Sequence, residues 1–371
     1  MLCGTFYLNE SLATCDRIIS IHDEVCGENS WKIKTYLTFM ICPIGFILNL
    51  FCLIVLLNDK KHRNVMRQNL ILLSMTEVFF TGFFIIDYIL SWAGNNLYNL
   101  PGNREHVFWR ARIIQLIIVI GDTFLSTRNW CNVIISVSRT EVIVSPLRRR
   151  KIFSKNRILI LYGMLFTFGF LLNIKRFFYE WFERCEIPET GERLWFKQFD
   201  SSLNIWFFLY FSFQTFLPFI LVIVTASLII YYIAPRSSSL TNISSSSNPV
   251  RRRHHKKATH TVLCLAAIFT LFETPTFIFS TLMKYYEFFD SKDEFYTKYI
   301  QNNENLYFIT EIFINLDSVC NIVAYSTSVP EIKIKIRAIF CYFCQKYQTK
   351  MDTTDDRNSN NSPNKLNDTS S

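Results

Sequence analysis

The sequence has few charged residues for its length. Asp, Glu, Lys and Arg make up only 19% of the 371 residues, whereas 50% are apolar and 16% are aromatic, including 36 Phe. A soluble chain of this size would have trouble covering its surface, but a chain whose outer surface faces lipid would not. The formal net charge of +9 comes from short basic clusters between apolar runs, so it does not require nucleic-acid binding. The composition therefore argues against a soluble enzyme.

The sequence also lacks the motifs of common catalytic sites. It has no nucleophile–base pair, phosphate-binding loop or metal-ligand spacing, so we predict no enzymatic activity, no cofactor and no metal site. No internal repeat is evident, which argues against a secondary transporter. Many of the eleven cysteines lie inside apolar runs, where a thiol is usually a small buried apolar group.

Seven apolar runs are present, each long enough to cross a bilayer as a helix, which takes about 20 residues. They predict an all-α membrane protein with a seven-transmembrane helix bundle over residues 35–329. Isolated ionisable groups within the runs must face the bundle interior. The predicted spans are 35–57, 69–92, 113–144, 158–174, 203–233, 261–283 and 306–329.

Basic residues are concentrated in alternate loops. Residues 58–68 hold four Lys or Arg against one acid, and residues 145–157 and 236–257 each hold six against none. Since Lys and Arg are retained on the cytoplasmic side, we predict a plasma-membrane protein with an extracellular segment 1–34 and a cytoplasmic carboxyl terminus. The basic clusters then orient the chain near anionic lipid.

Three features of the two ends follow from that orientation. Residues 330–344 alternate basic and apolar positions and predict a short amphipathic eighth helix on the inner leaflet, followed by a disordered tail, 345–371. Cys341 and Cys344 are candidates for palmitoylation, with unmodified thiols as the alternative. Asn9 lies in a glycosylation sequon on the predicted outer side.

Landmark residues occur in order on successive spans: Asn49, Glu77, Arg139, Pro146, Pro218, Phe269 with Pro275, and Asn321 with Tyr325. In type and order they resemble those of the rhodopsin-like G-protein-coupled receptors. The resemblance implies that Arg139, Pro146, Pro275, Asn321 and Tyr325 take part in activation and in coupling to a heterotrimeric G protein. The overall pattern is also similar to invertebrate peptide receptors of the FMRFamide type.

The chain also departs from that family's pattern. An acid usually precedes the family arginine, a proline follows the asparagine of span seven, and a tryptophan stands before the proline of span six. These positions hold Ser138, Ile322 and Glu273.

The usual disulfide of the family also lacks one partner. Ile114 stands where a cysteine normally pairs with the second outer loop, which leaves Cys185 without its usual mate. We expect Cys185 to pair with Cys26 or Cys15, since the compartment in which the outer face matures is oxidising. A free Cys185 remains the alternative.

Arg128 is the most unusual residue of the third span. It lies eleven residues before Arg139, almost three helical turns, so both side chains point to the same interior stripe. A guanidinium inside a membrane needs a partner. Glu77 and Asp317 lie at a similar depth by the resemblance, so we predict a buried ion pair of Arg128 with Glu77 and Asp317. The alternative is an Arg128 that reaches along the lipid-facing surface toward water.

Acidic and aromatic residues in the outer half of the spans suggest a ligand site. Asp87, Asp122, Glu273 and Glu311 lie there with Phe277 and other aromatic residues. Carboxylates beside aromatic rings suit a ligand with a cationic group and a ring, such as a short amidated peptide. Alternatively, several of these acids pair with basic residues of the chain itself.

The sequence therefore predicts a G-protein-coupled receptor that binds an extracellular ligand, most simply a short amidated neuropeptide. A chemosensory receptor for a small odorant would share the fold and differ in the ligand. A membrane transporter or ion channel would use the buried acids as an ion path.

Overall fold

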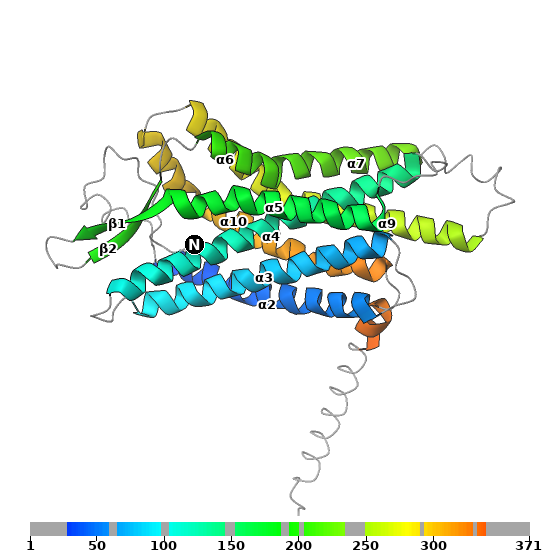
Figure 1. Cartoon of the computed structure of the whole chain (residues 1–371), viewed down its shortest axis with the longest axis horizontal. Helices are drawn as coiled ribbons and strands as arrows, with labels where there is room; N and C mark the ends of the chain where they lie inside the picture. Colours follow the sequence, from blue (N-terminus) through cyan, green and yellow to red (C-terminus); the bar gives the residue numbers. More distant parts are fainter. Residues whose placement is uncertain are drawn as a thin grey trace, which may run out of the picture.

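Seven long helical segments run side by side and form one bundle, as the prediction required (Figure 1). The computed structural model describes the backbone of residues 28–58, 65–97, 104–144, 153–186, 193–199, 204–233, 249–289, 293–328 and 332–338. The segments are α2 (Glu28–Asn58), α3 (Val65–Leu97), α4 (Arg104–Val144), α5 (Lys155–Tyr179), a series of α6 (Asn204–Phe211), η2 (Ser212–Phe216) and α7 (Leu217–Ile233), then α9 (Pro249–Phe289) and α10 (Asp293–Ser328).

Each predicted span overlaps one of these segments, although the bounds differ. The helices extend past the apolar runs because backbone hydrogen bonding does not stop where the hydrocarbon ends. Thus α4 and α9 are both 41 residues long, whereas about 20 residues suffice to cross the hydrocarbon. Pro43 lies within α2 and Pro275 within α9, and neither helix ends there.

A β-hairpin follows α5 directly, which the all-α prediction did not include. Strands β1 (Glu180–Glu186) and β2 (Arg193–Phe199) pair antiparallel, with Arg184 opposite Trp195. The hairpin lies at the left end of the bundle in Figure 1, and we call this the hairpin end. Pairing of the two strands satisfies backbone groups that an irregular loop would leave to water.

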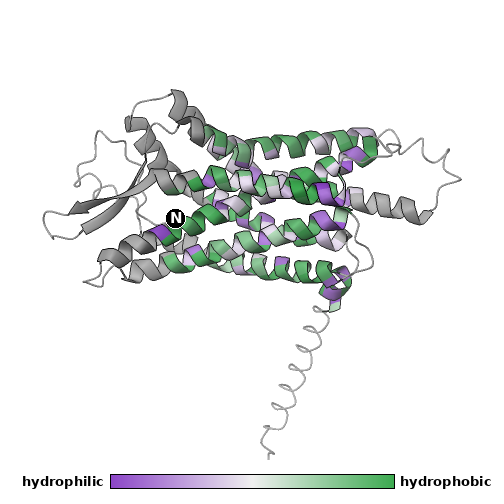
Figure 2. Ribbon diagram, in the orientation of Figure 1, coloured by the Kyte–Doolittle hydropathy of each residue, from purple (hydrophilic) through white to green (hydrophobic). Residues whose placement is uncertain are grey.

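The outer faces of the bundle are apolar and exposed. Ile160, Phe208 and Ile230, for example, are 56–61% exposed, and apolar residues cover the length of the described helices (Figure 2). A monomeric soluble protein rarely exposes so large an apolar surface. By length and composition α2, α3, α5, α6–α7 and α9 could each cross a membrane. The remaining two long helices, α4 and α10, carry buried charged residues such as Arg128 and Asp317, and α3 and α9 also carry buried acids.

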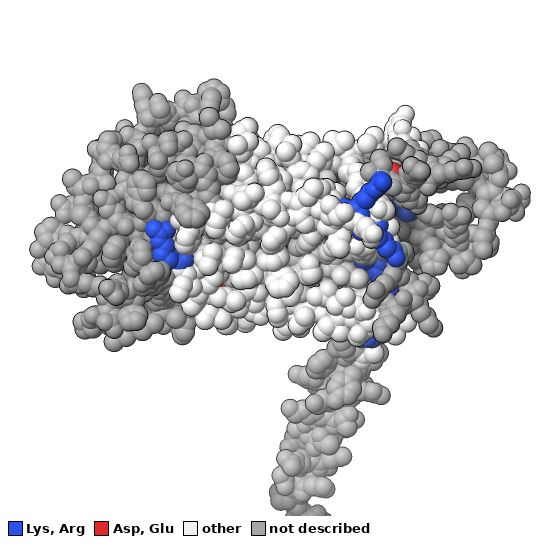
Figure 3. Space-filling model, in the orientation of Figure 1, with Lys and Arg blue, Asp and Glu red and all other residues white. Residues whose placement is uncertain are grey.

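Exposed basic residues mark the end of the bundle opposite the hairpin. Figure 3 shows Lys and Arg gathered there, beside a long stretch of uncharged surface. We call it the basic end, and its exposed members include Lys155, Arg157, Lys333, Lys335 and Arg337. This separation is the pattern expected for a chain whose middle faces hydrocarbon and whose ends face water.

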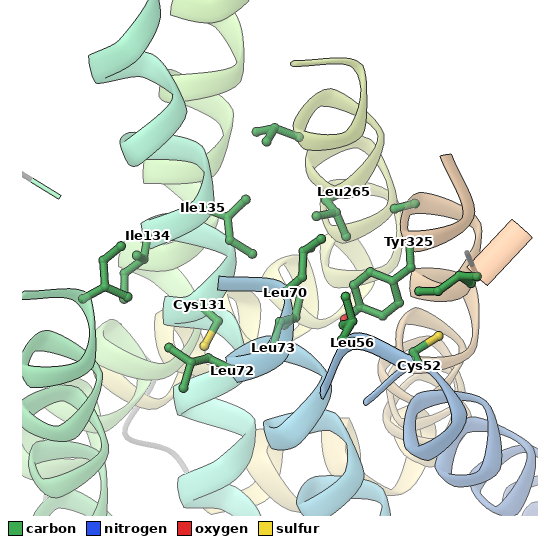
Figure 4. Packing of buried hydrophobic residues seen from close by; sticks show 14 of the residues in the cluster. Cys52, Leu56, Leu70, Leu72, Leu73, Cys131, Ile134, Ile135, Leu265 and Tyr325 are labelled. Carbon is green, nitrogen blue, oxygen red and sulfur yellow. The ribbon is translucent and has the colours of Figure 1, made fainter. Parts of the chain in front are cut away.

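The largest apolar core lies toward the basic end. Side chains from all seven long helical segments meet there, among them Leu56 of α2, Leu73 of α3, Ile135 of α4, Leu265 of α9 and Tyr325 of α10 (Figure 4). All five are at most 2% exposed. Helix α4 packs against α3, α5, α7 and α9, and α10 packs against α9, α2 and α3. The core therefore joins the helices around α4 to those around α10.

Part of the predicted amphipathic eighth helix is also described. Residues 332–338 are helical, with Ile332 fully buried and Ile336 packed against the core. Lys333, Lys335 and Arg337 are exposed. The helix thus has an apolar contact with the bundle and a basic outer surface.

The change from α6 to α7 is explained by Pro218. Because proline has no N–H, the Gln214 carbonyl loses its usual helical donor, and Asn129 Nδ2 donates to it instead at 2.9 Å. The N–H of Leu217 donates to Ser212, five residues back, which leaves the Phe213 carbonyl to accept from Trp130 Nε1 at 2.9 Å. Two neighbouring side chains of α4 therefore complete the backbone hydrogen bonding of η2.

Candidate functional site

Arg128 lies in the middle of α4 and contacts three carboxyl groups from three other helices. Its Nη2 bonds to Glu273 Oε1 of α9, its Nη1 lies 3.5 Å from Asp317 Oδ2 of α10, and its Nε lies 4.0 Å from Glu77 Oε1 of α3. The four side chains are 0–1% exposed. We call these four residues the charge cluster.

The guanidinium has further partners besides the carboxyl groups. Arg128 Nε donates to Asn129 Oδ1 at 3.2 Å, and Nη1 donates to the carbonyl of Ile314 at 3.1 Å. The Phe80 ring centroid lies 5.3 Å from the guanidinium carbon, within range of a cation–π contact. Because Arg128 is fully buried, the alternative in which it reaches along the lipid surface does not describe this structure.

Glu77 has a hydrogen bond on each oxygen. Asn321 Nδ2 donates to Oε1 at 2.8 Å, and the Ser318 hydroxyl donates to Oε2. The landmark Asn49 binds the same turn of α10, because its Nδ2 donates to the Ser318 carbonyl at 2.8 Å and to Gly45 O at 2.9 Å. Two of the landmark residues therefore build the surroundings of Glu77.

Asp317 differs from Glu77 in its surroundings. Neither of its oxygens accepts a hydrogen bond from the described residues, although both are buried. Its contact with Arg128 at 3.5 Å is longer than an ordinary charge-assisted hydrogen bond. Among the described contacts, the Asp317 carboxyl thus has the fewest hydrogen bonds of the three carboxyl groups in the charge cluster.

Glu273 occupies a different place from the one its sequence position suggested. The sequence put it among the ligand-binding acids, whereas the structure places it on Arg128 inside the bundle. A buried guanidinium is costly without partners, and the spans contain few acids, so the sequence could have indicated Glu273 as a partner of Arg128. The prediction assigns the acids to separate roles by depth and therefore does not include Glu273 as a third partner of Arg128.

The other predicted ligand-binding acids lie nearer the hairpin end. Asp87 of α3 and Glu311 of α10 are each 7% exposed, and the Tyr88 hydroxyl donates to Glu311 Oε2 at 3.4 Å. Asp122 of α4 is partly buried and accepts from the Tyr210 hydroxyl at 3.3 Å. These three acids therefore lie on three helices, away from the contacts of the charge cluster.

Phe277 packs between α9 and α7. Its ring stacks on Phe219 with centroids 4.4 Å apart and on Phe216 at 5.6 Å. It belongs to a second apolar cluster around Val222 and Phe269. The described contacts of Phe277 are those of a packing residue.

A second polar contact joins α4 to α9 near the basic end. Arg139 donates to the Thr259 hydroxyl from Nε at 2.9 Å and from Nη2 at 2.5 Å. The preceding residue, Ser138, accepts from Asn69 Nδ2 at 3.3 Å. Glu141 accepts from the backbone N–H of Phe153 at 3.3 Å. Two arginines of α4 thus contact α9, one at the centre of the bundle and one near its basic end.

Some predicted sites lie outside the described residues. They are Asn9, Cys26, Pro146, Cys341 and Cys344, together with most of segment 1–34 and the tail 345–371. Cys185 lies in β1, where the backbone alone is described.

One family of known proteins matches the chain. The model of the family described as "7 transmembrane receptor (rhodopsin family)" matches residues 48–325, which include the charge cluster and Arg139. No match was found among curated proteins.

Proposed function

Because the chain belongs to the rhodopsin family of seven-transmembrane receptors, we propose that it binds an extracellular ligand and activates a heterotrimeric G protein. The protein is a multi-pass receptor of the plasma membrane. In our proposal the hairpin end faces the outside and the basic end faces the cytoplasm, since Lys and Arg are retained on the cytoplasmic side.

The observation that carries the proposal is the double polar attachment of α9 to α4. Arg128 holds Glu273 at the centre of the bundle, and Arg139 holds Thr259 near the basic end. A ligand that shifts α9 relative to α4 would change both contacts, and the second lies where a cytoplasmic partner would bind. In our proposal α9 with these two contacts is the two-state element that an outer and an inner partner both bias, which signalling across a membrane requires.

The proposed ligand is a short amidated peptide with a cationic side chain and an aromatic ring. Asp87 and Glu311 supply buried carboxyl groups toward the hairpin end, and Tyr88 and Phe84 lie beside them, with ring centroids 5.5 Å apart. Carboxylates bind a guanidinium through charge-assisted hydrogen bonds, and the rings offer stacking surfaces. Glu273 is not part of this site in the proposal, because it binds Arg128.

Ligand-dependent G-protein activation in cells tests the proposal. A library of amidated peptides, each with Arg and with the neutral analogue citrulline at the same position, would be applied to cells that express the full chain. We expect an Arg peptide to activate and its citrulline twin to be at least tenfold weaker, since a charged hydrogen bond contributes about 1.5–3 kcal/mol. A response to small apolar odorants but to no peptide would favour the chemosensory alternative. Ion flux without G-protein activation would favour the transporter or channel.

Matched variants locate the ligand site and the coupling site. Glu311→Gln should weaken the Arg peptide more than the citrulline peptide, because only the first has a charge for Glu311 to bind. Arg139→Ala should abolish G-protein activation while ligand binding persists. Arg157→Ala is the control for the second variant, because Arg157 is an exposed arginine at the same end of the bundle. Equal losses in the two arginine variants would contradict a specific role for Arg139.

A further inference from the structure

The charge cluster is not electrically balanced. One guanidinium, Arg128, faces three carboxyl groups, and within the described part of the chain Arg128 is the one positive charge that acts on them. With all four groups ionised, the cluster would carry two excess negative charges at 0–1% exposure. Carboxyl groups that cannot find a positive partner in a buried site take up protons.

The described side chains of the helices packed around the cluster do not supply the missing charge. The described side chains of α2 include no basic or acidic group, and their titratable members are the thiols Cys42 and Cys52. Cys131 of α4 and, on α10 itself, Cys320 and Tyr325 also lie near the cluster, and none of them is basic. The described residues also contain no group of three His, Cys, Asp or Glu placed to hold a metal ion. A proton therefore fits the site better than a metal cation.

The hydrogen bonds indicate which carboxyl group takes the proton. Both oxygens of Glu77 accept hydrogen bonds, and Glu273 is bonded directly to Arg128. Both oxygens of Asp317 are buried without a donor among the described residues. A neutral carboxyl group is far less costly than a carboxylate in such a place.

We propose that Asp317 is a proton-binding site of the bundle, neutral while Glu273 is bound to Arg128. The proton comes from water and no other bond is made or broken. When Glu273 moves away from Arg128 with α9, the guanidinium needs another counter-ion, and Asp317 releases its proton and becomes that counter-ion. The receptor thus releases a proton as it activates.

The consequence for signalling rests on the proposed function, whereas the proton site itself does not. Since the resting state holds one more proton than the active state, acid favours the resting state. Agonist potency should therefore fall as the pH falls, by up to about tenfold per pH unit for one proton. Asp317→Asn, which imitates the neutral form permanently, should remove this dependence.

Thermal stability and infrared spectroscopy of the full-length protein in lipid nanodiscs test the proton site directly. Asp317→Asn should keep nearly the wild-type stability, because it replaces a neutral group with a neutral group of similar size. Glu273→Gln should be clearly less stable, because it replaces a charge that Arg128 uses. The wild type should show the carbonyl band of a protonated carboxyl group, shifted in D₂O, which Asp317→Asn removes and Glu311→Gln does not.

Three results would overturn the proposal. The first is a loss of stability in Asp317→Asn equal to that in Glu273→Gln, since it would mean that Asp317 is ionised. The second is an infrared band that persists in Asp317→Asn. The third is a change in the stability of the wild type when choline chloride is replaced by sodium chloride, which would assign the site to a metal cation. A confirmed band together with a pH-independent agonist potency would instead refute the signalling step alone.

Discussion

Arg128→Met is the substitution that perturbs the structure most. Methionine keeps an unbranched apolar stem but removes the guanidinium, so Glu77 and Glu273 lose their counter-ion and Asp317 loses its contact with Arg128, all at 0–1% exposure. Removing one partner of a buried ion pair costs about 3–5 kcal/mol, which lowers the ratio of folded to unfolded protein by about 100-fold to 4000-fold. We expect low surface expression and a lower thermal midpoint for purified full-length protein in detergent.

The control for this variant is Arg112→Met on the same helix. Arg112 is partly buried and donates to Gln115 Oε1 at 3.1 Å and to the Phe177 carbonyl at 3.0 Å. Its loss should cost about 1 kcal/mol. The double variant Arg128→Met with Glu273→Met should recover part of the stability, because it also removes one uncompensated carboxyl group. Equal midpoints for Arg128→Met and Arg112→Met would refute the reasoning, because they would mean that the three carboxyl groups do not depend on Arg128.

Three further substitutions test contacts between helices. Asn49→Ala should destabilise the protein by about 1–2 kcal/mol in thermal unfolding, because the Ser318 carbonyl loses its donor from α2; an unchanged midpoint would contradict this. Thr259→Val removes the acceptor of Arg139 at nearly constant volume and should raise G-protein signalling without ligand by up to about fivefold, since the contact is worth about 1 kcal/mol; lower basal signalling would count against it. Trp130→Phe should cost about 1 kcal/mol of stability, because the Phe213 carbonyl loses its hydrogen bond from the indole. Trp130→Leu also removes the ring contact with Phe213, so a loss of stability no larger than that in Trp130→Phe would show that the ring contact is unimportant.

The bundle could be predicted from the sequence because membrane-spanning runs are a strong signal. An apolar run of about 20 residues has few alternatives to a buried or membrane-spanning helix, and each predicted run lies in a helical segment. The hairpin could not be predicted because its strands mix charged and aromatic residues without a regular alternation of apolar and polar positions. The π-helical segment η2 depends on side chains of α4, so the local sequence does not determine it alone.

The partners of individual residues were harder to predict than the helices. Helix α7 is apolar on nearly every side, so its sequence gives little contrast between the lipid-facing and the inward faces. For this reason Phe277 could be placed in the outer half but its stacking on Phe219 could not be foreseen. That Arg128 needs a partner could be predicted from the cost of a buried charge, and the family resemblance indicated Glu77 and Asp317. Predicting Glu273 as the third partner would also have required knowing how α9 is rotated about its axis.

The distance between α4 and α9 at the basic end tests most directly the claim that Arg128 and Glu273 hold these helices together. Spin labels would be carried by unnatural amino acids at Val144 and His260, which are exposed on the two helices, because the chain has eleven native cysteines. A pair at Leu57 and Leu159, exposed on α2 and α5, serves as the control. In Glu273→Gln we expect a population with a longer distance between Val144 and His260 and no change in the control pair. Identical distance distributions in the wild type and Glu273→Gln would contradict the claim.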